Sequence, residues 1–486
     1  MRLSELLREV EFEGSIKNDF DIKFVTDDSR LVRPGALFVC IRHRSFDGHT
    51  AAAEALASGA AAVVTQERLG LENELNVADS RAAYARLCAA LCGHPERKLR
   101  MIGVTGTNGK TTVTTLIRNI LSDSGIKTLL TGTVCNRLGE ESLPSGLTTP
   151  KPPELYSLLS RAVLSGCEAC VAEASSQALA QGRLEGIAFD AAVFTNITRD
   201  HLDYHGTFEN YLAAKKKLFE HSEVSAVNLD DPRADEIIAA SSGKTVTFST
   251  VLDCADYTAK NISLLPEGVS FELVSKGRIE HINFASPGLF SVSNAMAAVV
   301  CAINLGVDPR SAAQSLARSK GVCGRLERVE CGTPYSVIID YAHTPDGLEQ
   351  VLRALRPSCR GKLIVLFGCG GDRDKTKRPL MGAAACKYAD TVIVTSDNPR
   401  SEEPMKIIGD ILKGTDKKRR GLFIEEDRRR ATALALSLAK PGDTVLLAGK
   451  GHEKYQLICG EKSPLDERET VREILGLPHD TGRKKP

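Results

Sequence analysis

A glycine-containing loop between an apolar run and an amphipathic stretch most constrains how this chain can fold. Residues 102–112 read IGVTGTNGKTT. Gly106, Gly109, Lys110 and Thr111 have the spacing G-x-x-G-K-T, which lets backbone N–H groups surround phosphate oxygens at the start of a helix. The pattern predicts a nucleotide-binding loop between a strand and a helix, with Lys110 on the β- and γ-phosphates and Thr111 on a Mg²⁺ ion.

The flanking residues support this interpretation. The common pattern G-x-x-x-x-G-K-[ST] requires glycine at position 104, where this chain has Val104, so the loop is of the shorter kind. A strand is predicted over 100–105, and a helix follows whose apolar face is Val113, Leu116, Ile117, Ile120 and Leu121. A glycine-rich turn without phosphate is the alternative, and these two elements disfavour it. The fate of the phosphate stays open: water, a hydroxyl or a carboxylate could receive it.

The 486 residues divide into three regions: 1–98, 99–328 and 329–486. The first has strand-like runs at 36–41 and 60–65 with an alanine-rich helical stretch between them. It ends in the polar segment CGHPERKLR (92–100), which we interpret as a linker.

The third region alternates strand candidates with helical segments. The strands are SVIIDYA, KLIVLFG, TVIVTSD, LFIEED and TVLLAG. This alternation predicts a doubly wound, parallel sheet of the Rossmann type, with functional loops at the carboxyl ends of the strands. The chain as a whole is therefore expected to be an α/β protein.

Composition excludes several classes of protein. Lys and Arg total 63 against 62 Asp and Glu, so no basic field indicates nucleic-acid binding. No apolar run approaches the roughly 18 residues of a membrane span, and the N-terminus does not resemble a signal peptide. The 14 scattered cysteines indicate a reducing cytoplasm. Cys167 and Cys170 have C-x-x-C spacing without a second pair, and we interpret them as core residues.

The stretch NITRDHLDYHG (196–206) concentrates acids and histidines. His201 and His205 have the spacing of a zinc-protease helix, but Leu202 stands where the catalytic glutamate is required. A Mg²⁺ site and a charged helix start both remain open, and Glu173, at the end of a predicted strand, could share a metal with His201. Taken alone, the lysines at 215–217 indicate a solvated charge run.

Four polar loops follow strands of the third region and should meet at one edge of its sheet. They supply Arg373, Arg378, Asp397, Asn398, Arg400, Lys450, His452 and Glu453. Because Arg binds carboxylates through two parallel hydrogen bonds, the cluster suits a small zwitterion with carboxylates and an amine. Ordinary polar turns are the alternative, which four loops on one edge disfavour.

A series of motifs resembles the Mur ligase family. They occur in the family's order, from about Asp28 to Glu469: GVTGTNGKTT, EASSQAL, FTNITRDHLDYHG, YLAAKKKLF, FSVSNAMAA, GRLERV, DYAHTPDGL, FGCGGDRD, SDNPR and AGKGHE. The nearest type is the one that adds the third peptide residue of the peptidoglycan precursor. The resemblance implies three α/β domains: a small uridine-nucleotide-binding domain at 1–98, a central ATP-binding, P-loop-like domain at 99–328 and an amino-acid-binding domain at 329–486.

The resemblance also implies the reaction. It is that of an ATP-dependent carbon–nitrogen ligase joining meso-2,6-diaminopimelate to UDP-N-acetylmuramoyl-L-alanyl-D-glutamate through an acyl phosphate. The form DNPR (397–400) resembles the loop that accompanies diaminopimelate. An L-lysine-adding ligase, a folate polyglutamylating ligase, a P-loop nucleotide switch and a non-catalytic binding module are the alternatives. A cytoplasmic monomer that requires ATP and Mg²⁺ is expected.

Site residues follow from the resemblance by position. ATP contacts are expected at Gly106, Thr107, Asn108, Gly109, Lys110, Thr111, Thr112, Asn294, Arg325 and Asp340. The muramoyl dipeptide is expected at Ser29, Thr148, Thr149, Ser175, Gln177 and Arg183. Diaminopimelate is expected at Arg373, Asp397, Asn398, Pro399, Arg400, Gly449 and Glu453.

Metal and catalytic roles follow in the same way. Mg²⁺ is expected on Thr111, Glu173, His201 and Lys215, with Lys215 carried as a carbamate (N6-carboxylysine) formed from CO₂. Together with Lys110, the last three would be the catalytic residues. The chain departs from the family at His43, Gln177, Ser291 and Cys323, and the substrate contact of Gln177 is open for that reason.

Overall fold

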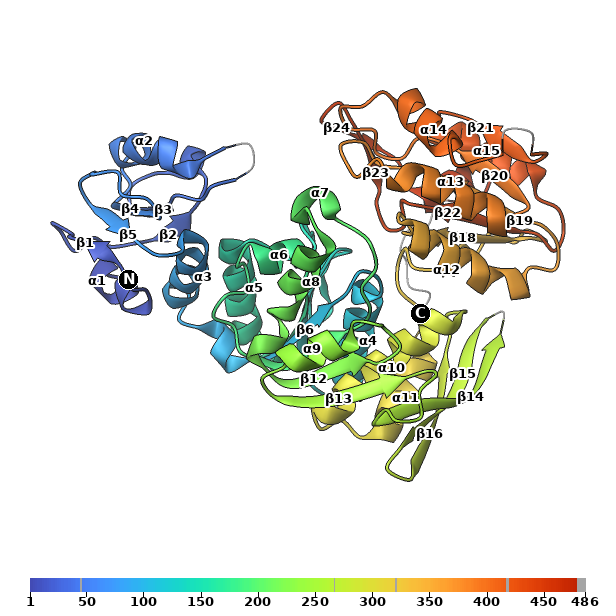
Figure 1. Ribbon diagram of the computed structural model, residues 1–486, viewed down its shortest axis with the longest axis horizontal. Coiled ribbons are helices and arrows are strands. Elements are labelled where there is room, and N and C mark those ends of the chain that lie inside the picture. The colour runs from blue at the N-terminus through green and yellow to red at the C-terminus, as the bar shows by residue number, and fades with distance from the viewer. Residues whose placement is uncertain (44–45, 266, 320, 417–418, 479–486) are drawn as a thin grey trace.

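The computed structural model describes residues 1–43, 46–265, 267–319, 321–416 and 419–478. Three sheets follow one another along the chain, with five, eleven and six strands. In Figure 1 they form three successive lobes, with the first and third at opposite ends of the middle one. The expected three-domain α/β fold is confirmed, and its exact boundaries stay a prediction.

The first lobe is a small sheet in the order β1-β5-β4-β3-β2. Its strands are β1 (Glu13–Gly14), β2 (Phe24–Thr26), β3 (Ala36–Val39), β4 (Ala62–Thr65) and β5 (Glu74–Asn76). Its helices are α1 (Leu3–Leu6), α2 (Ala52–Ala57) and α3 (Ser80–Leu91). β3 and β4, which lie within the two predicted strand runs, are buried throughout because both faces of the sheet are covered.

The segment expected to be a linker is part of the packed structure. Pro95–Lys98 form a 3₁₀-helix, and Pro95, Glu96 and Leu99 are buried. One apolar core runs without interruption from Leu87 of α3 to Tyr156 of α5 (Pro152–Leu164). The segment that connects α3 to β6 is therefore packed against a neighbouring helix, which its polar composition does not reveal.

The middle sheet has the order β16-β15-β14-β13-β12-β11-β6-β10-β7-β8-β9. Its central strands are parallel: β6 (Arg100–Thr105), β7 (Thr128–Thr131), β10 (Ala169–Glu173), β11 (Phe189–Phe194), β12 (Ser222–Asn228) and β13 (Lys244–Ser249). The outer strands are β8 (Asn136–Leu138), β9 (Glu141–Leu143), β14 (Tyr257–Leu265), β15 (Gly268–Ser275) and β16 (Arg278–Phe284).

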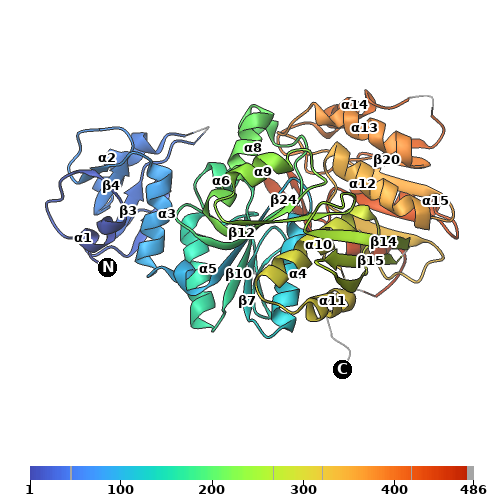
Figure 2. The ribbon, with the colours of Figure 1, turned by 60° about the horizontal axis from the view of Figure 1, so that its bottom comes forward.

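Helices cover both faces of this sheet (Figure 2). Besides α5, they are α4 (Lys110–Asp123), α6 (Ser176–Ala180), α7 (Leu202–His205), α8 (Phe208–Lys216), α9 (Ala234–Ala240), α10 (Leu289–Asn304) and α11 (Pro309–Arg318). The predicted apolar face of α4 is buried, and Gly125 beyond its end has φ +87°, as its C-terminal role requires. Cys167 and Cys170 are buried and unpaired, so the prediction of core cysteines is confirmed.

The third sheet has the order β17-β18-β22-β19-β20-β21. Its strands are β17 (Glu327–Arg328), β18 (Ser336–Asp340), β19 (Leu363–Phe367), β20 (Thr391–Val394), β21 (Leu422–Ile424) and β22 (Thr444–Ala448). All five predicted strands are present and mutually parallel, with β17 antiparallel at the edge. A separate hairpin, β23 (Tyr455–Ile458) and β24 (Glu461–Pro464), was not predicted.

Helices lie on both faces of the third sheet. They are α12 (Pro345–Leu355), α13 (Lys377–Tyr388), α14 (Pro404–Leu412), α15 (Arg428–Leu438) and α16 (Glu467–Ile474). The first three pack in one core and the last two in another, which is the doubly wound arrangement that the alternation predicts. Among the described residues, none of the helices has the length and apolar character that crossing a membrane requires.

Candidate active site

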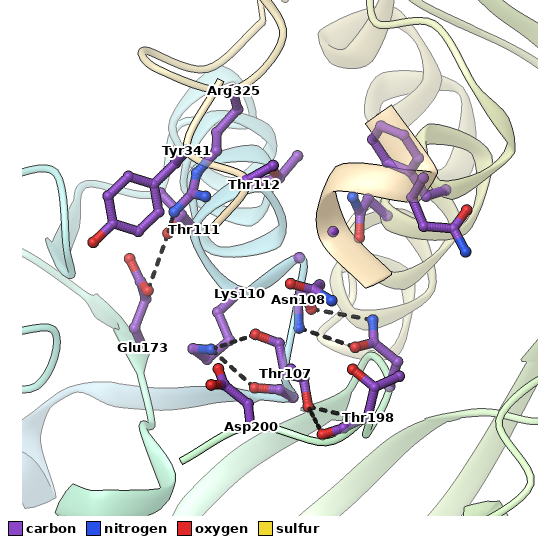
Figure 3. A pocket seen from close by; sticks show the side chains of 18 of the residues that line it. Thr107, Asn108, Lys110, Thr111, Thr112, Glu173, Thr198, Asp200, Arg325 and Tyr341 are labelled. Atoms are coloured by element: carbon purple, nitrogen blue, oxygen red, sulfur yellow. Dashed lines mark hydrogen bonds between the residues drawn. The ribbon is translucent and has the colours of Figure 1, made fainter. Parts of the chain in front are cut away.

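The phosphate loop connects β6, in the centre of the middle sheet, to the first turn of α4 (Figure 3). Gly109 has φ +88°, and a Cβ there would lie 2.5 Å from Asn294 Oδ1. A Cβ on Gly106 would lie 1.9 Å from Thr195 Oγ1. Both positions therefore require glycine, one for its left-handed backbone and the other for the close approach of the next loop.

Lys110 is folded back onto this loop. Its Nζ donates to Gly106 O at 2.9 Å and to Thr107 O at 3.0 Å. Burial lowers the pKa of its ammonium, while the charges of Glu173 and Asp200 oppose that effect. A cation held over the loop by two neutral carbonyls can exchange them for phosphate oxygens, which are stronger acceptors.

A second loop, at the start of the stretch 196–206, shapes the first, and its contacts with the phosphate loop were not predicted from the sequence. It follows β11, the parallel neighbour of β6. Asn196 Oδ1 accepts from Asn108 N at 2.9 Å, and Thr195 Oγ1 donates to Asn108 O at 2.6 Å. Thr107 Oγ1 donates to Thr198 O at 3.1 Å. The buried strand-like run that ends in FTN was the available signal, because neighbouring parallel strands end at the same edge.

Glu173 ends β10 beside the loop and is 1% exposed. Its carboxylate accepts from Thr111 Oγ1 at 3.1 Å and from the N and Oγ1 of Thr133 at 2.8 and 2.9 Å. His201 lies in the left-handed region with φ +53°, its Nε2 3.4 Å from Asp200 Oδ2. Burial lowers the pKa of this imidazole.

Lys215 is almost completely buried in α8, 1% exposed, whereas Lys217 is exposed. Its Nζ lies 4.6 Å from the centre of the Tyr211 ring. Burial, together with the charge of Lys110, lowers the pKa of this amine well below its usual range. A solvated charge run is therefore the wrong interpretation for Lys215.

A cavity of about 520 Å³ joins these groups. Every residue expected to bind ATP lines it, as do Glu173, His201 and Lys215. Of the residues expected to bind the dipeptide, all except Ser29 line it: Thr148, Thr149, Ser175, Gln177 and Arg183. Ser29 lies in the first domain, in a 3₁₀ turn that Asp28 caps.

The dipeptide side of the cavity is built around Thr149. Its Oγ1 donates to Glu173 O at 2.6 Å, and Arg183 Nη1 donates to its carbonyl at 2.6 Å. Ser175, at the N-cap of α6, lies 3.1 Å from the same hydroxyl. These bonds connect the loop before α5 to the end of β10, so the candidate dipeptide contacts and the candidate metal ligand Glu173 form one hydrogen-bonded unit.

The third domain reaches the cavity through its connection to the middle domain. The guanidinium carbon of Arg325 lies 4.6 Å from the centre of the Tyr341 ring. The Nη2 of Arg325 donates to Thr111 Oγ1 at 3.0 Å. Asn108 Nδ2 donates to Asp346 Oδ2 of α12 at 3.1 Å. Asp340 ends β18 and accepts from Leu326 N and Ala342 N, both at 2.7 Å. Tyr341 and Asp346 were not predicted from the sequence.

The polar loops of the third sheet do meet at one edge, as predicted. Lys450 Nζ donates to Asn398 Oδ1 at 2.8 Å and to Glu453 Oε2 at 2.7 Å. Arg400 Nη1 donates to Gly371 O at 2.7 Å, which joins this cluster to the loop of Arg373. Burial and the nearby charge of Arg373 lower the pKa of Arg400.

None of the seven residues expected to bind diaminopimelate lines the cavity around the phosphate loop. The structure therefore forms two half-sites: one in the middle domain with its junction and one on the third sheet. Among the described residues, no three His, Cys, Asp or Glu side chains are grouped to hold a metal. A cation at Glu173 would require further oxygen ligands from a substrate or a modified side chain.

One pH effect follows from His343, near the domain junction. Burial is the largest cause that lowers its pKa from 6.5 to about 4, and the charge of Lys377 adds to it. The unfolded chain therefore binds the proton first as the pH falls, so stability is present above pH 6.5 and is lost towards pH 4. After allowance for partial exposure, we expect a loss of about 1–3 kcal/mol.

His343→Gln removes this proton linkage. We expect the difference in Tm between the wild type and this variant to shrink from pH 7 to pH 4.5 in thermal unfolding. His281→Gln, at a side chain that is 76% exposed, is the matched control and should give a curve parallel to the wild type. A constant difference for His343→Gln would contradict the assigned pKa.

Comparisons with known proteins agree with this architecture. Three family models match in order: Mur ligase family, catalytic domain, at 21–89; Mur ligase middle domain at 104–302; and Mur ligase, glutamate ligase domain, at 324–451. UDP-N-acetylmuramoyl-L-alanyl-D-glutamate–2,6-diaminopimelate ligases of Syntrophomonas wolfei and Caldanaerobacter subterraneus are 42% and 43% identical. Each alignment covers 98% of this chain and 99% of the relative.

A solved structure of an enzyme with the same name is similar over the whole chain. It has 34% identity and a TM-score of 0.70, and the match covers 98% of this chain and 99% of that one. Similarity of this extent, with the three family models in succession and the phosphate loop where the middle model begins, leaves one conclusion: the chain belongs to the Mur ligase family.

Proposed function

We propose that this protein is the ATP-dependent ligase that joins meso-2,6-diaminopimelate to UDP-N-acetylmuramoyl-L-alanyl-D-glutamate in peptidoglycan synthesis. The relatives that are about 40% identical along their whole length have this activity in their names. The observation that supports it best is the single cavity in which the phosphate loop meets Glu173, Lys215 and Arg183. A phosphate can pass there from a nucleotide to a carboxylate without crossing solvent.

The proposed reaction has two steps. The γ-carboxylate of the D-glutamyl residue attacks the γ-phosphorus of ATP, an acyl phosphate forms and ADP leaves. The amine of diaminopimelate then attacks the acyl carbon, and phosphate leaves from the tetrahedral intermediate as the amine loses its proton. Lys110 neutralises charge on the transferring phosphoryl group, and Arg183 and Thr149 orient the dipeptide.

Mg²⁺ would be held by Thr111, Glu173, His201 and Lys215 as its carbamate. The residues present fit a hard cation, because a buried carboxylate and a hydroxyl already face each other there. When bound, Mg²⁺ supplies positive charge that reduces repulsion between the carboxylate and the phosphates. The depressed pKa of Lys215 favours its neutral amine, which adds to CO₂ through a new N–C bond with release of one proton.

The amino-acid substrate would occupy the third-sheet half-site. The positive charge of Arg373 is close enough to lower the pKa of Arg400. Among the described side chains, no carboxylate forms a hydrogen bond with Arg400. That arrangement suits a substrate carboxylate, and diaminopimelate has one at each end. L-lysine lacks the second, so it would leave one guanidinium without its anion.

Domain closure would unite the two half-sites. The contact of Asn108 with Asp346 already connects the third domain to the phosphate loop. Arg325, which bonds to Thr111, also lies over the ring of Tyr341 in the third domain. Movement of the third domain about this junction would bring the amine to the acyl phosphate and exclude water. We also propose that the enzyme acts as a monomer, because one chain supplies every group of the reaction. We propose that it acts in the cytoplasm, where its 14 cysteines would stay reduced.

The test is phosphate release with ATP, Mg²⁺ and the UDP-muramoyl dipeptide, with meso-diaminopimelate compared against L-lysine. We expect release that depends on the dipeptide and is strong only with diaminopimelate, with the matching mass gain in the product. Strong release with lysine would favour the lysine-adding ligase. Release without dipeptide or amine would favour a nucleotide switch.

A further inference from the structure

A buried ion pair lies under the amino-acid half-site and has no role in the proposed chemistry. Arg428 begins α15 and Glu467 begins α16, and both side chains are 1% exposed. Arg428 donates from Nε at 2.9 Å and from Nη2 at 2.7 Å, both to Glu467 Oε1. Glu467 Oε2 is buried without a hydrogen-bond partner within the described part of the chain.

Stability alone does not explain this pair. Removal of two charges from water costs about as much as their attraction returns, so a buried pair adds little net stability. Arg428 also lies at the N-terminus of its helix, where the helix dipole disfavours a cation. Its contacts beyond Glu467 indicate another purpose.

The guanidinium also binds the ends of two strands that are not paired with each other in the sheet. Nη2 donates to Ala448 O at 2.7 Å, and Nη1 donates to Ser396 O at 3.4 Å. Ala448 ends β22, and Ser396 follows β20; β19 lies between these strands. Asp397–Arg400 and Gly449–Glu453, the two loops of the half-site, begin at the next residue in each case.

A second buried cation connects the same two loops through their side chains. Lys450 is fully buried, and its Nζ contacts Asn398 and Glu453 and lies 3.5 Å from Asp397 Oδ1. The spacing of the two loops is therefore determined twice: by Arg428 at their bases and by Lys450 between them. Loss of Arg428 would leave the Lys450 contacts in place but would release the backbone at the two bases, Ser396 and Ala448.

We propose that the Arg428–Glu467 pair is a positioning device that sets the spacing of the two loops and thereby the selection of the amino-acid substrate. The inference rests on the proposed function. Asn398 and Arg400 on one loop must bind the same small molecule as Glu453 on the other. Because a displacement of about 1 Å in such a site costs up to about 100-fold in rate, the spacing decides which zwitterion fits.

The test is the double variant Arg428→Met/Glu467→Leu, which replaces the pair by apolar side chains of similar size. Folding should survive, with Tm within about 3 °C of the wild type, because such replacements of buried pairs are often neutral. We expect the KM for diaminopimelate to rise about 10-fold or more and the preference for it over L-lysine to fall. The KM values for ATP and the UDP-dipeptide should stay within about 2-fold of wild type, as both bind in the other half-site.

Arg356→Met is the matched control. Arg356 also binds one carboxylate, Asp390 at 2.6 Å, and two carbonyls, those of Cys359 and Gly361, but at the opposite edge of the same sheet. The KM of the Arg356→Met variant for diaminopimelate should equal that of the wild type. The single variant Arg428→Lys, which keeps the positive charge beside Glu467 but loses the forked guanidinium that bonds Ser396 O and Ala448 O together, should give the same selective rise in KM if the double variant fails to fold.

The outcomes separate this inference from the proposed function. A folded double variant with unchanged KM for diaminopimelate and unchanged discrimination overturns the positioning role. An equal rise in all three KM values also overturns it, because the pair would then act on the whole fold. Absence of product from diaminopimelate with the wild type overturns the proposed function instead.

Discussion

Lys110→Met should lower kcat about 1000-fold, because the variant loses the cation that neutralises the transferring phosphoryl group. Among the residues that the structure describes, the Nζ of Lys110 bonds only to carbonyls of its own loop, those of Gly106 and Thr107. Burial already disfavours its charge, as the lowered pKa shows. The methionine variant should therefore fold with little change in Tm, and the loss should appear in phosphate release at saturating ATP.

Lys244→Met is the control for loss of a positive charge. Lys244 lies in β13 of the same domain, is exposed, and contacts Asn304 Oδ1 at 3.1 Å. Its kcat should equal that of the wild type. A Lys110→Met variant that retained more than about a tenth of wild-type kcat would show that the loop amides alone hold the transition state.

Arg400→Met should lower kcat/KM for diaminopimelate by about 100-fold or more, as expected when one partner of a desolvated charge pair is truncated. Arg400 has φ +53°, a backbone conformation that residues other than glycine adopt only under constraint. Its guanidinium bonds to Gly371 O. It is thus held in place before substrate arrives. L-lysine has no second carboxylate, so the low activity with lysine should change by less than about 3-fold.

The ratio of kcat/KM for diaminopimelate to that for L-lysine is the deciding quantity. Arg430→Gln, an exposed arginine of α15 in the same domain, should leave this ratio unchanged. If Arg400→Met lowered both activities equally, the guanidinium would serve the structure of the loop and not the far carboxylate. Thermal unfolding of each variant excludes loss of the fold as the cause.

Local pattern was sufficient where one short segment determines both structure and chemistry. The phosphate loop was predicted because its glycines, Lys110 and the periodicity of α4 lie within about twenty residues of one another. The strands of the third sheet were predicted because buried parallel strands are continuous apolar runs. That their loops meet at one edge follows from the topology alone.

Long-range packing decided what local pattern did not reveal. The segment 92–100 is polar by composition, yet Pro95 and Leu99 are buried. The hairpin of β23 and β24 was not predicted either, because its two strands have four residues each and mixed polarity. The extension of the middle sheet by β14–β16 was also not predicted, although Val269, Phe271 and Leu273 of β15 alternate as buried residues with period 2.

The sequence by itself determined the class of fold, the phosphate loop, the family and the set of polar residues at the edge of the third sheet. Only the tertiary structure decided which of three consecutive lysines is buried: Lys215 lies against Tyr211, whereas Lys217 is exposed. It alone paired Arg428 with Glu467, 39 residues further along the chain. The physical reason is that burial and charge pairing depend on contacts between distant segments, whereas periodicity and loop spacing are properties of neighbouring residues.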